Sequence, residues 1–234
     1  MRKIIKKLRD EAARKYLKDI LSCIEVNKEH VFLDCGCDDG EWTSKIIKKG
    51  DFRIQNCYGI EIISERIKLA KEKGIKVIKR DLNNALPFKG NSFDIIHTNQ
   101  VIEHLYNTHE FLRELFRITK TGGYIVICTE NLASWHNIFS LLFGYQPFSL
   151  TNISPTYFGI GNPMAPHYKE KMPNPNSWQH IRVFAYRGLL EHVEEVGFKI
   201  EKVSGAGYYP LNFLSKLDPR HSAFLTIKAR KPSQ

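Results

Sequence analysis

The chain has 234 residues, 42% hydrophobic and 26% charged, with a net charge of +10; this composition is ordinary for a folded globular protein and excludes a disordered chain. The length suits a single domain over residues 1–234. The longest apolar run, near residues 138–143, is far too short to span a bilayer, and the N-terminus lacks the apolar core of a signal peptide, so we expect a cytoplasmic protein without a transmembrane segment.

The five cysteines are odd in number and scattered along the chain. They do not form a disulfide framework, and Cys35 and Cys37 lack the second pair that a zinc site would need. We therefore predict reduced thiols buried in the core.

The N-terminal segment, residues 1–26, carries most of the positive charge. Residues 1–18 hold eight Lys or Arg against two acidic residues, which leaves +4 for the rest of the chain. Apolar side chains recur at helical spacing and predict an amphipathic basic helix; they are Ile5, Leu8, Ala12, Tyr16, Ile20 and Ile24. We favour packing of this stripe on the domain over the alternative, binding to an anionic surface or a nucleic acid.

A buried strand over residues 31–34 runs into a glycine turn and a helix over residues 41–49. Gly36 and Gly40 can adopt positive φ, which lets the backbone approach a ligand closely. The turn lacks the three glycines of a dinucleotide fingerprint. Two aspartates between the glycines would repel a phosphate group but would tolerate a cofactor with an amine or a sulfonium.

The stretch of residues 33–40 resembles the first motif of class I S-adenosylmethionine-dependent methyltransferases, whose usual form is h-L-D-x-G-C-G-x-G. The matching residues are Leu33, Asp34, Gly36, Cys37 and Gly40, and Asp38 stands where the family usually has its middle glycine. The resemblance extends over residues 30–130 and resumes near residue 180. It implies that S-adenosylmethionine is the cofactor, that Asp34, Gly36, Cys37 and Gly40 contact it, and that the leading helix covers its pocket.

Two further strands end in carboxylates. The strand over residues 57–62 contains Glu61 near its end, and the strand over 75–79 is followed by Asp81. Taken alone, such residues are solvated charges or turn residues. The resemblance assigns Glu61, with its neighbour Ile62, to the ribose of the cofactor, and it assigns Asp81 and Leu82 to the adenine.

A fourth strand over residues 93–97 leads into the segment 98–105. The resemblance places this segment along the methionine part of the cofactor, where Asn99 and Gln100 could contact it. An amphipathic helix over 108–118, a turn over 120–123 and a fifth strand over 124–128 follow.

Residues 131–180 interrupt the alternation of strands and helices. The segment starts with an expected helix over residues 135–143 and then becomes irregular, with six of the ten prolines and many aromatic residues. Long loops in compact domains are usually functional or disordered, and the aromatic content argues against disorder. We predict a lid-like insertion over the carboxyl edge of the sheet, with an aromatic plug or a dimer contact as the alternative.

A helix over residues 186–196 and strands over 198–203 and 222–230 complete the chain. Strands alternating with helices imply an α/β, doubly wound sheet. The resemblance implies a Rossmann-like sheet of seven strands in the order 3-2-1-4-5-7-6, with the last strand antiparallel.

The expected reaction is displacement of the sulfonium methyl by a substrate nucleophile, which needs alignment and exclusion of water. The aromatic lid favours a small-molecule or lipid-like acceptor, methylated at oxygen. RNA or DNA is the alternative acceptor, but this chain has Asn99-Gln100-Val101-Ile102 where the family's amino-methylating nucleic-acid enzymes usually have Asn/Asp-Pro-Pro-Tyr/Phe. A cofactor-binding module without catalysis is a third possibility, and both a monomer and a homodimer remain open.

An oxygen acceptor that must lose its proton needs a general base. His180 lies where the insertion returns to the domain, and His104 lies beside the expected methionine end of the cofactor. We prefer His180 and rank His104 second, although a lone histidine is more often structural. Ubiquinone-pathway O-methyltransferases have a similar Glu-x-x-Glu-His cluster that binds a metal; because Gln100 replaces the first Glu here, we expect no metal.

Overall fold

The computed structural model describes residues 2–171, 179–209 and 211–233. Its seven strands form one sheet in the order β3-β2-β1-β4-β5-β7-β6, and β7 runs antiparallel to both of its neighbours, which confirms the predicted topology. The strands are β1 (Phe32–Cys35), β2 (Cys57–Glu61), β3 (Lys76–Lys79), β4 (Phe93–Asn99), β5 (Thr119–Glu130), β6 (Lys199–Ala206) and β7 (Phe224–Arg230).

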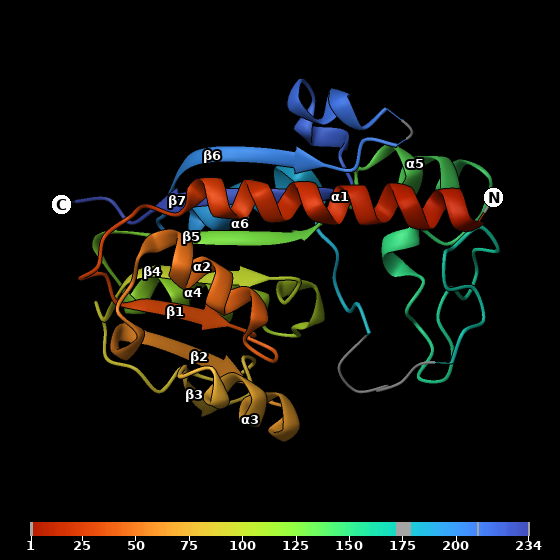
Figure 1. Cartoon of the computed structure of the whole chain (residues 1–234). Coiled ribbons are helices and arrows are strands. Elements are labelled where there is room, and N and C mark those ends of the chain that lie inside the picture. The colour runs from red at the N-terminus through yellow and green to blue at the C-terminus, as the bar shows by residue number, and fades with distance from the viewer. Residues whose placement is uncertain (1, 172–178, 210, 234) are drawn as a thin grey trace.

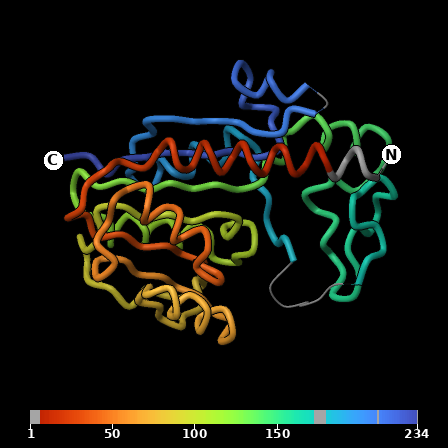
Figure 2. The backbone as a smooth tube through the Cα atoms, viewed as in Figure 1, coloured from red at the N-terminus to blue at the C-terminus, as the bar shows by residue number. Residues whose placement is uncertain are grey.

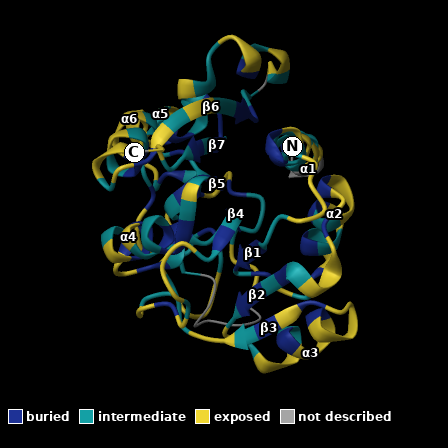
Figure 3. Cartoon of the chain, turned by 90° about the vertical axis from the view of Figure 1, so that its left-hand side faces the viewer, coloured by how far each residue is buried: buried dark blue, intermediate teal, exposed yellow. Residues whose placement is uncertain are grey.

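Helices cover both faces of the sheet. They are α1 (Arg2–Cys23), α2 (Glu41–Gly50), α3 (Ser64–Glu72), α4 (Thr108–Ile118), α5 (Trp135–Leu142) and α6 (Tyr186–Glu195). Figure 3 shows α1 and α2 on one face and α4 and α6 on the other. All four residues of β1 are buried because helices cover both of its faces, as its continuous apolar run predicts.

Several expected boundaries differ from the structure by one to three residues, and the largest difference is at the start of β5. The turn predicted over residues 120–123 belongs to β5, which begins at Thr119, because Gly122 and Gly123 continue the strand past an irregularity in its pairing with β4. The N-terminal helix ends at Cys23 rather than at residue 26. None of the helices in the described part of the chain combines the length and apolarity required to cross a bilayer.

Part of the predicted apolar stripe, from Ala12 to Ile20 of α1, packs on the domain. Ala12 and Ile20 are buried, and Ile20 packs in one core cluster with Phe32 of β1 and Ile46 of α2. Figure 1 shows that α1 runs along the length of the sheet, so that its N-terminal half lies beside the carboxyl ends of the parallel strands. The helix therefore forms a wall at the sheet edge where open α/β folds bind ligands.

The segment after β5 also lies at this edge. It contains α5 and a short 3-10 helix, η3 (Phe148–Leu150), and it is irregular from there to residue 171. Figure 2 traces its backbone at the same end of the molecule as the start of α1. Residues 172–178 of the predicted insertion lie outside the described residues.

Candidate functional site

A cavity of about 1450 Å³ lies at the carboxyl ends of the parallel strands. Its walls come from the turn after β1, the ends of β2 and β4, the N-terminal half of α1 and the segment between β5 and α6. Nine of the ten predicted cofactor residues line it, as do both predicted base candidates, His104 and His180. Gly40 does not line the cavity.

The turn after β1 keeps a left-handed geometry although Asp38 replaces a glycine. Gly36 has φ 80° and Asp38 has φ 48°. Aspartate tolerates this region better than most residues do. The backbone N–H groups of Gly36 and Cys37 both donate to the carbonyl of Ile60, at 2.9 and 3.0 Å, and this holds the turn against β2.

The second glycine of the motif has a packing role. Gly40 precedes α2 with φ 79°, and a Cβ at this position would lie 3.0 Å from Ala70 of α3 and 2.8 Å from the Ile75 side chain. Gly40 therefore permits the close approach of α2 and α3. The predicted contact between Gly40 and the cofactor is not supported by its position.

Backbone donors hold two carboxylates at the cavity wall. One oxygen of Glu61 accepts from the N–H groups of Ile62 and Ile63, at 2.8 and 2.9 Å, and the other accepts from the N–H of Asp38 at 3.1 Å. Asp81 accepts from the backbone N–H of Asn83 at 2.9 Å. Because the backbone orients both groups, they present preorganised acceptors for hydroxyl and amino donors of a ligand.

Asp34 has a buried partner that the sequence did not indicate. One of its oxygens accepts from the Thr43 hydroxyl at 2.6 Å, and the other accepts from Nδ1 of His97 at 2.8 Å. Nε2 of His97 is buried and has no hydrogen-bond partner among the described residues. Asp34 lines the cavity, but its carboxylate is engaged in joining β1, α2 and β4.

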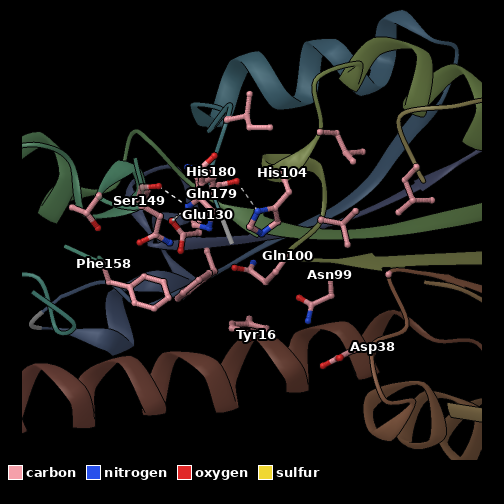
Figure 4. A pocket seen from close by; sticks show the side chains of 18 of the residues that line it. Tyr16, Asp38, Asn99, Gln100, His104, Glu130, Ser149, Phe158, Gln179 and His180 are labelled. Carbon is pink, nitrogen blue, oxygen red and sulfur yellow. Dashed lines mark hydrogen bonds and ion pairs between the residues drawn. The ribbon is translucent and has the colours of Figure 1, made fainter. Parts of the chain in front are cut away.

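The end of β4 contributes polar groups opposite α1. Gln100 has φ 54°, which is uncommon for a residue other than glycine, and its N–H donates to the carbonyl of Cys128 at 2.8 Å. Its side-chain Nε2 is buried and has no partner among the described residues. Figure 4 shows Gln100 and Asn99 between Tyr16 of α1 and the two histidines.

His104 and His180 meet on the cavity wall from distant parts of the chain. Their ring centroids lie 4.8 Å apart in an edge-to-face arrangement. Nδ1–H of His104 donates to the carbonyl of Gln179 at 2.9 Å, and Nδ1–H of His180 donates to the carbonyl of Ser149 at 2.7 Å. Each bond fixes the orientation of its ring, and neither bond involves Nε2 (Figure 4).

Two carboxylates that sequence reasoning did not select lie beside this pair. Oε2 of Glu130 lies 3.6 Å from Nδ1 of His180 and makes no hydrogen bond within the described structure. Glu103 is fully buried and accepts from the Thr129 hydroxyl at 2.9 Å. A signal was available for Glu130, because it ends β5 at the ligand-binding edge of the sheet.

The surroundings of these side chains shift their pKa values in different directions. Burial and the neighbouring His180 lower the pKa of His104 to about 4. Burial also lowers the pKa of His180, but the carboxylates of Glu130 and Glu103 more than offset it, so that this pKa lies above the ordinary histidine value. Burial raises the pKa of Glu103 to about 7, although His180 and Thr129 oppose the rise. His180 is therefore the stronger base of the two histidines.

Two clusters among the described residues have a geometry that could hold a metal ion. One ligand atom each from Glu103, His104 and His180 lie within 4.8 Å of one another. Glu103 does not line the cavity, which limits its access to an ion that enters from solvent. The second cluster, made of His109, His192 and Glu195, joins α4 to α6.

The donor set of the cavity suits S-adenosylmethionine. Carboxylates at the ends of β2 and β3 can accept from ribose hydroxyls and an adenine amino group, and Asp38 and Asp39 bring negative charge near a cationic ligand. The cavity is larger than the ~300–1,000 Å³ of a typical single-ligand pocket, so that a second molecule fits beside the cofactor.

Comparison with known proteins supports this interpretation. Residues 5–203 match the family model described as "Methyltransferase domain". An uncharacterised protein of Methanocaldococcus jannaschii is 24% identical over 212 residues, covering 89% of this chain and 87% of that protein. The demethylmenaquinone methyltransferase of Listeria monocytogenes serotype 4a is 25% identical over 214 residues, covering 82% and 80%.

Other relatives are longer than this chain. The mitochondrial ubiquinone biosynthesis O-methyltransferase of Rattus norvegicus is 24% identical over 189 residues, but the match covers 77% of this chain and only 47% of that protein. Among solved structures, a SAM-dependent methyltransferase from Thermotoga maritima shares the fold with a TM-score of 0.60 at 19% identity, over 96% of this chain and 91% of that one. Because the family model covers most of its length, the chain belongs to the methyltransferase domain family, and its cofactor is S-adenosylmethionine.

Proposed function

We propose that the enzyme methylates a hydroxyl oxygen of a small-molecule or lipid-like acceptor. The position of His180 carries the proposal: this imidazole lies on the cavity wall, is oriented by the Ser149 carbonyl, and is made more basic by Glu130 and Glu103. A hydroxyl nucleophile needs such a base, because its proton must leave as the new bond forms.

The acceptor half of the cavity, lined by the segment after β5, is rich in aromatic side chains, and the charged residues Arg9, Glu130, Glu170 and Lys171 also line the cavity. Phe148 and Phe158 line it from the segment after β5, and Tyr209 and His136 lie beside them. From residue 131 to residue 168 the sequence contains no Asp, Glu, Lys or Arg. A nucleic acid needs Lys and Arg side chains that neutralise its phosphates, so this wall favours an uncharged or apolar acceptor.

The proposed mechanism assigns these side chains as follows. S-adenosylmethionine supplies the methyl group. Nε2 of His180 accepts the proton of the acceptor hydroxyl, and Glu130 and Glu103 stabilise the resulting imidazolium. His104, whose pKa is about 4, stays neutral and shapes the pocket beside the acceptor.

We propose that His180 acts as a base without a metal. Gln100 stands where the ubiquinone-pathway O-methyltransferases that this segment resembles have a carboxylate. One oxygen of Glu103 is engaged by the Thr129 hydroxyl, and Glu103 does not line the cavity. Residues 131–171, together with Gln179 and His180, would act as the lid over the acceptor.

All five cysteines are free thiols, which is consistent with a cytoplasmic enzyme.

Transfer of a labelled methyl group tests the proposal. The wild-type chain is incubated with methyl-labelled S-adenosylmethionine and a panel of phenols, catechols and hydroxyquinones, with and without an isoprenoid tail, and with transfer RNA in parallel. We expect label in an ether-linked methyl on one of the hydroxyl compounds. Label on RNA alone, or on nitrogen compounds but not on hydroxyl compounds, would contradict it.

A further inference from the structure

The segment between β5 and α6 exposes an unusual apolar surface. In a chain that is 26% charged, residues 131–168 carry no charged side chain. On α5, Phe139, Leu142 and Phe143 are 55%, 73% and 68% exposed. Their spacing of three and four residues places them on one face of the helix. An apolar helix face is therefore exposed to solvent, and no charged residue lies near it in the sequence.

A second exposed apolar group lies on the 3-10 helix η4 (Asn212–Lys216) and just after it. Phe213 and Leu217 are 68% and 80% exposed. The region around η4 contacts α5. The indole N–H of Trp135 donates to the Tyr208 hydroxyl at 2.6 Å, and the Trp135 ring stacks on the His221 ring with centroids 4.5 Å apart. We call the exposed residues of α5 and η4 the apolar end.

The segment from α5 to residue 164, together with residues 211–217, holds most of the exposed large hydrophobic side chains in the described part of the chain. Of the 17 large hydrophobic residues that are exposed there, eight lie between residues 139 and 164 and three between residues 211 and 217. Singly scattered apolar residues are normal on a surface, whereas a concentration of them marks an interaction site. Figure 1 shows α5 and the start of α1 at the same end of the molecule.

Exposed lysines lie on segments that carry or adjoin the apolar end, and one of them, Lys171, also lines the cavity. They are Lys7 on α1, Lys169 and Lys171 after the uncharged stretch, and Lys216 on η4. Arg9 of α1 bonds to His167, so the N-terminal half of α1 lies beside the segment that carries Lys169 and Lys171. The carboxylates nearby have partners: Glu170 bonds His167 at 2.6 Å, Asp218 bonds His221 at 2.6 Å, and Asp10 lies 3.6 Å from Arg9. Glu11 of α1 accepts a hydrogen bond from the Asn212 amide of η4 at 3.3 Å.

We propose that the apolar end docks on a lipid bilayer that contains anionic lipids. A bilayer offers hydrocarbon to the Phe and Leu side chains and negative headgroups to the exposed lysines, the combination that interfacial membrane binders use.

The docked face is the outer side of a cavity wall. His136, on the same helix as the exposed phenylalanines, lines the cavity, and Phe148 of η3 lies close to it with ring centroids 5.3 Å apart. Docking would bring the acceptor side of the cavity to the membrane surface. The proposal does not depend on the identity of the acceptor, because it concerns the outer surface alone.

Vesicle sedimentation of the full-length chain tests the docking. The vesicles contain either phosphatidylcholine alone or phosphatidylcholine mixed with phosphatidylglycerol. A triple variant, Phe139→Gln, Leu142→Gln and Phe143→Gln, removes the apolar face of α5. The matched control replaces three exposed apolar residues elsewhere, Val26→Gln, Ile54→Gln and Leu69→Gln. Calorimetric affinity for S-adenosylhomocysteine checks that both variants are folded.

We expect the wild type to bind the mixed vesicles, and the α5 variant to lose about tenfold or more in the partition coefficient, because each buried Phe or Leu contributes substantially to transfer from water. The control should match the wild type. A separate double variant, Lys7→Glu with Lys216→Glu, should weaken binding to the mixed vesicles only.

Three results would overturn the proposal. The first is a wild type that binds neither vesicle. The second is an equal loss of binding in the α5 variant and the control. The third is a wild-type dimer in sedimentation velocity that the α5 substitutions convert to a monomer, since the apolar end would then be a contact between copies of this chain.

Discussion

His104 and His180 face each other edge-to-face at 4.8 Å, yet their environments shift their pKa values in opposite directions. Burial and the partner ring hold the pKa of His104 near 4, while the carboxylates of Glu130 and Glu103 hold the pKa of His180 above its ordinary value. One ring is therefore fixed in its neutral form, and the other can exchange a proton near neutral pH. Such divergence between neighbouring groups is typical of an acid–base site.

Replacing His180 should slow methyl transfer without weakening cofactor binding. General-base catalysis contributes about 10²–10⁴-fold, and we expect His180→Ala to lose that factor in single-turnover experiments at saturating cofactor. The wild-type rate should rise with pH until the imidazolium is deprotonated, with its midpoint above the ordinary histidine value. His104→Ala should leave this midpoint essentially in place, because His104 is neutral in this pH range and its removal takes no charge away from His180. Wild-type rates in both variants between pH 6 and 9 would show that catalysis relies on positioning alone.

Glu61→Ala should weaken S-adenosylmethionine binding by about 1–3 kcal/mol through the loss of charge-assisted hydrogen bonds. Glu65→Ala is the matched control, since Glu65 is exposed in the first turn of α3, the helix that follows β2. Calorimetry on both variants measures the difference. Equal affinities for the two variants would show that Glu61 does not bind the cofactor. Its role would then be limited to its contacts with the start of α3.

Glu103→Gln should change the pH dependence of stability. The folded-state pKa of Glu103 is about 7 against an ordinary value of 4.5, so between these values the folded protein keeps a proton that the unfolded chain releases. The free energy of unfolding therefore falls as pH rises through this window, by about 3 kcal/mol from this group. Gln cannot ionise, and the variant should gain stability relative to wild type between pH 4.5 and 7. Denaturant titrations at pH 4.5 and pH 8 that show parallel changes in both proteins would contradict this.

Gly36→Ala should destabilise the fold by about 2 kcal/mol or more, because the left-handed backbone penalises a Cβ. A Cβ there would also lie 2.4 Å from a methyl of Val101. Gly188→Ala is a suitable control: this glycine lies in α6 with open space around its Cα, and the substitution should stabilise the protein by about 0.5–1 kcal/mol. Thermal unfolding of both variants measures the contrast, and a Gly36→Ala protein as stable as wild type would show that the turn can relax.

Methyl transfer should survive dialysis against EDTA if His180 is a base rather than a metal ligand. Activity lost on dialysis and restored by Mg²⁺ or Zn²⁺ would reverse that assignment. In that case His104→Ala and His180→Ala should both lower metal affinity, since both side chains belong to the cluster with Glu103.

The sequence predicted the sheet order through its resemblance to class I methyltransferases, and the order of its elements predicted the ligand-binding edge of the sheet. Strand, glycine turn and helix follow one another locally around Gly36, and carboxylates at the ends of parallel strands reach the same edge in any right-handed α/β sheet. Glu61 and Asp81 could therefore be placed at the cavity from the order of elements alone. Gly40 belongs to the same local pattern, but its Cα faces α3, a packing detail that the pattern does not encode.

Only the tertiary structure decided which groups meet at the acceptor side. His104 and His180 come from segments about 75 residues apart in the chain, and Glu130 reaches them from the end of β5. Their pKa shifts depend on burial and on neighbours that no local pattern specifies. Asp34 is a second case in which packing decided the contacts of a side chain. Its motif predicts a cofactor contact, but Thr43 of α2 and His97 of β4 orient its carboxylate. The packing of α2 and β4 on β1 supplies these hydrogen-bond donors.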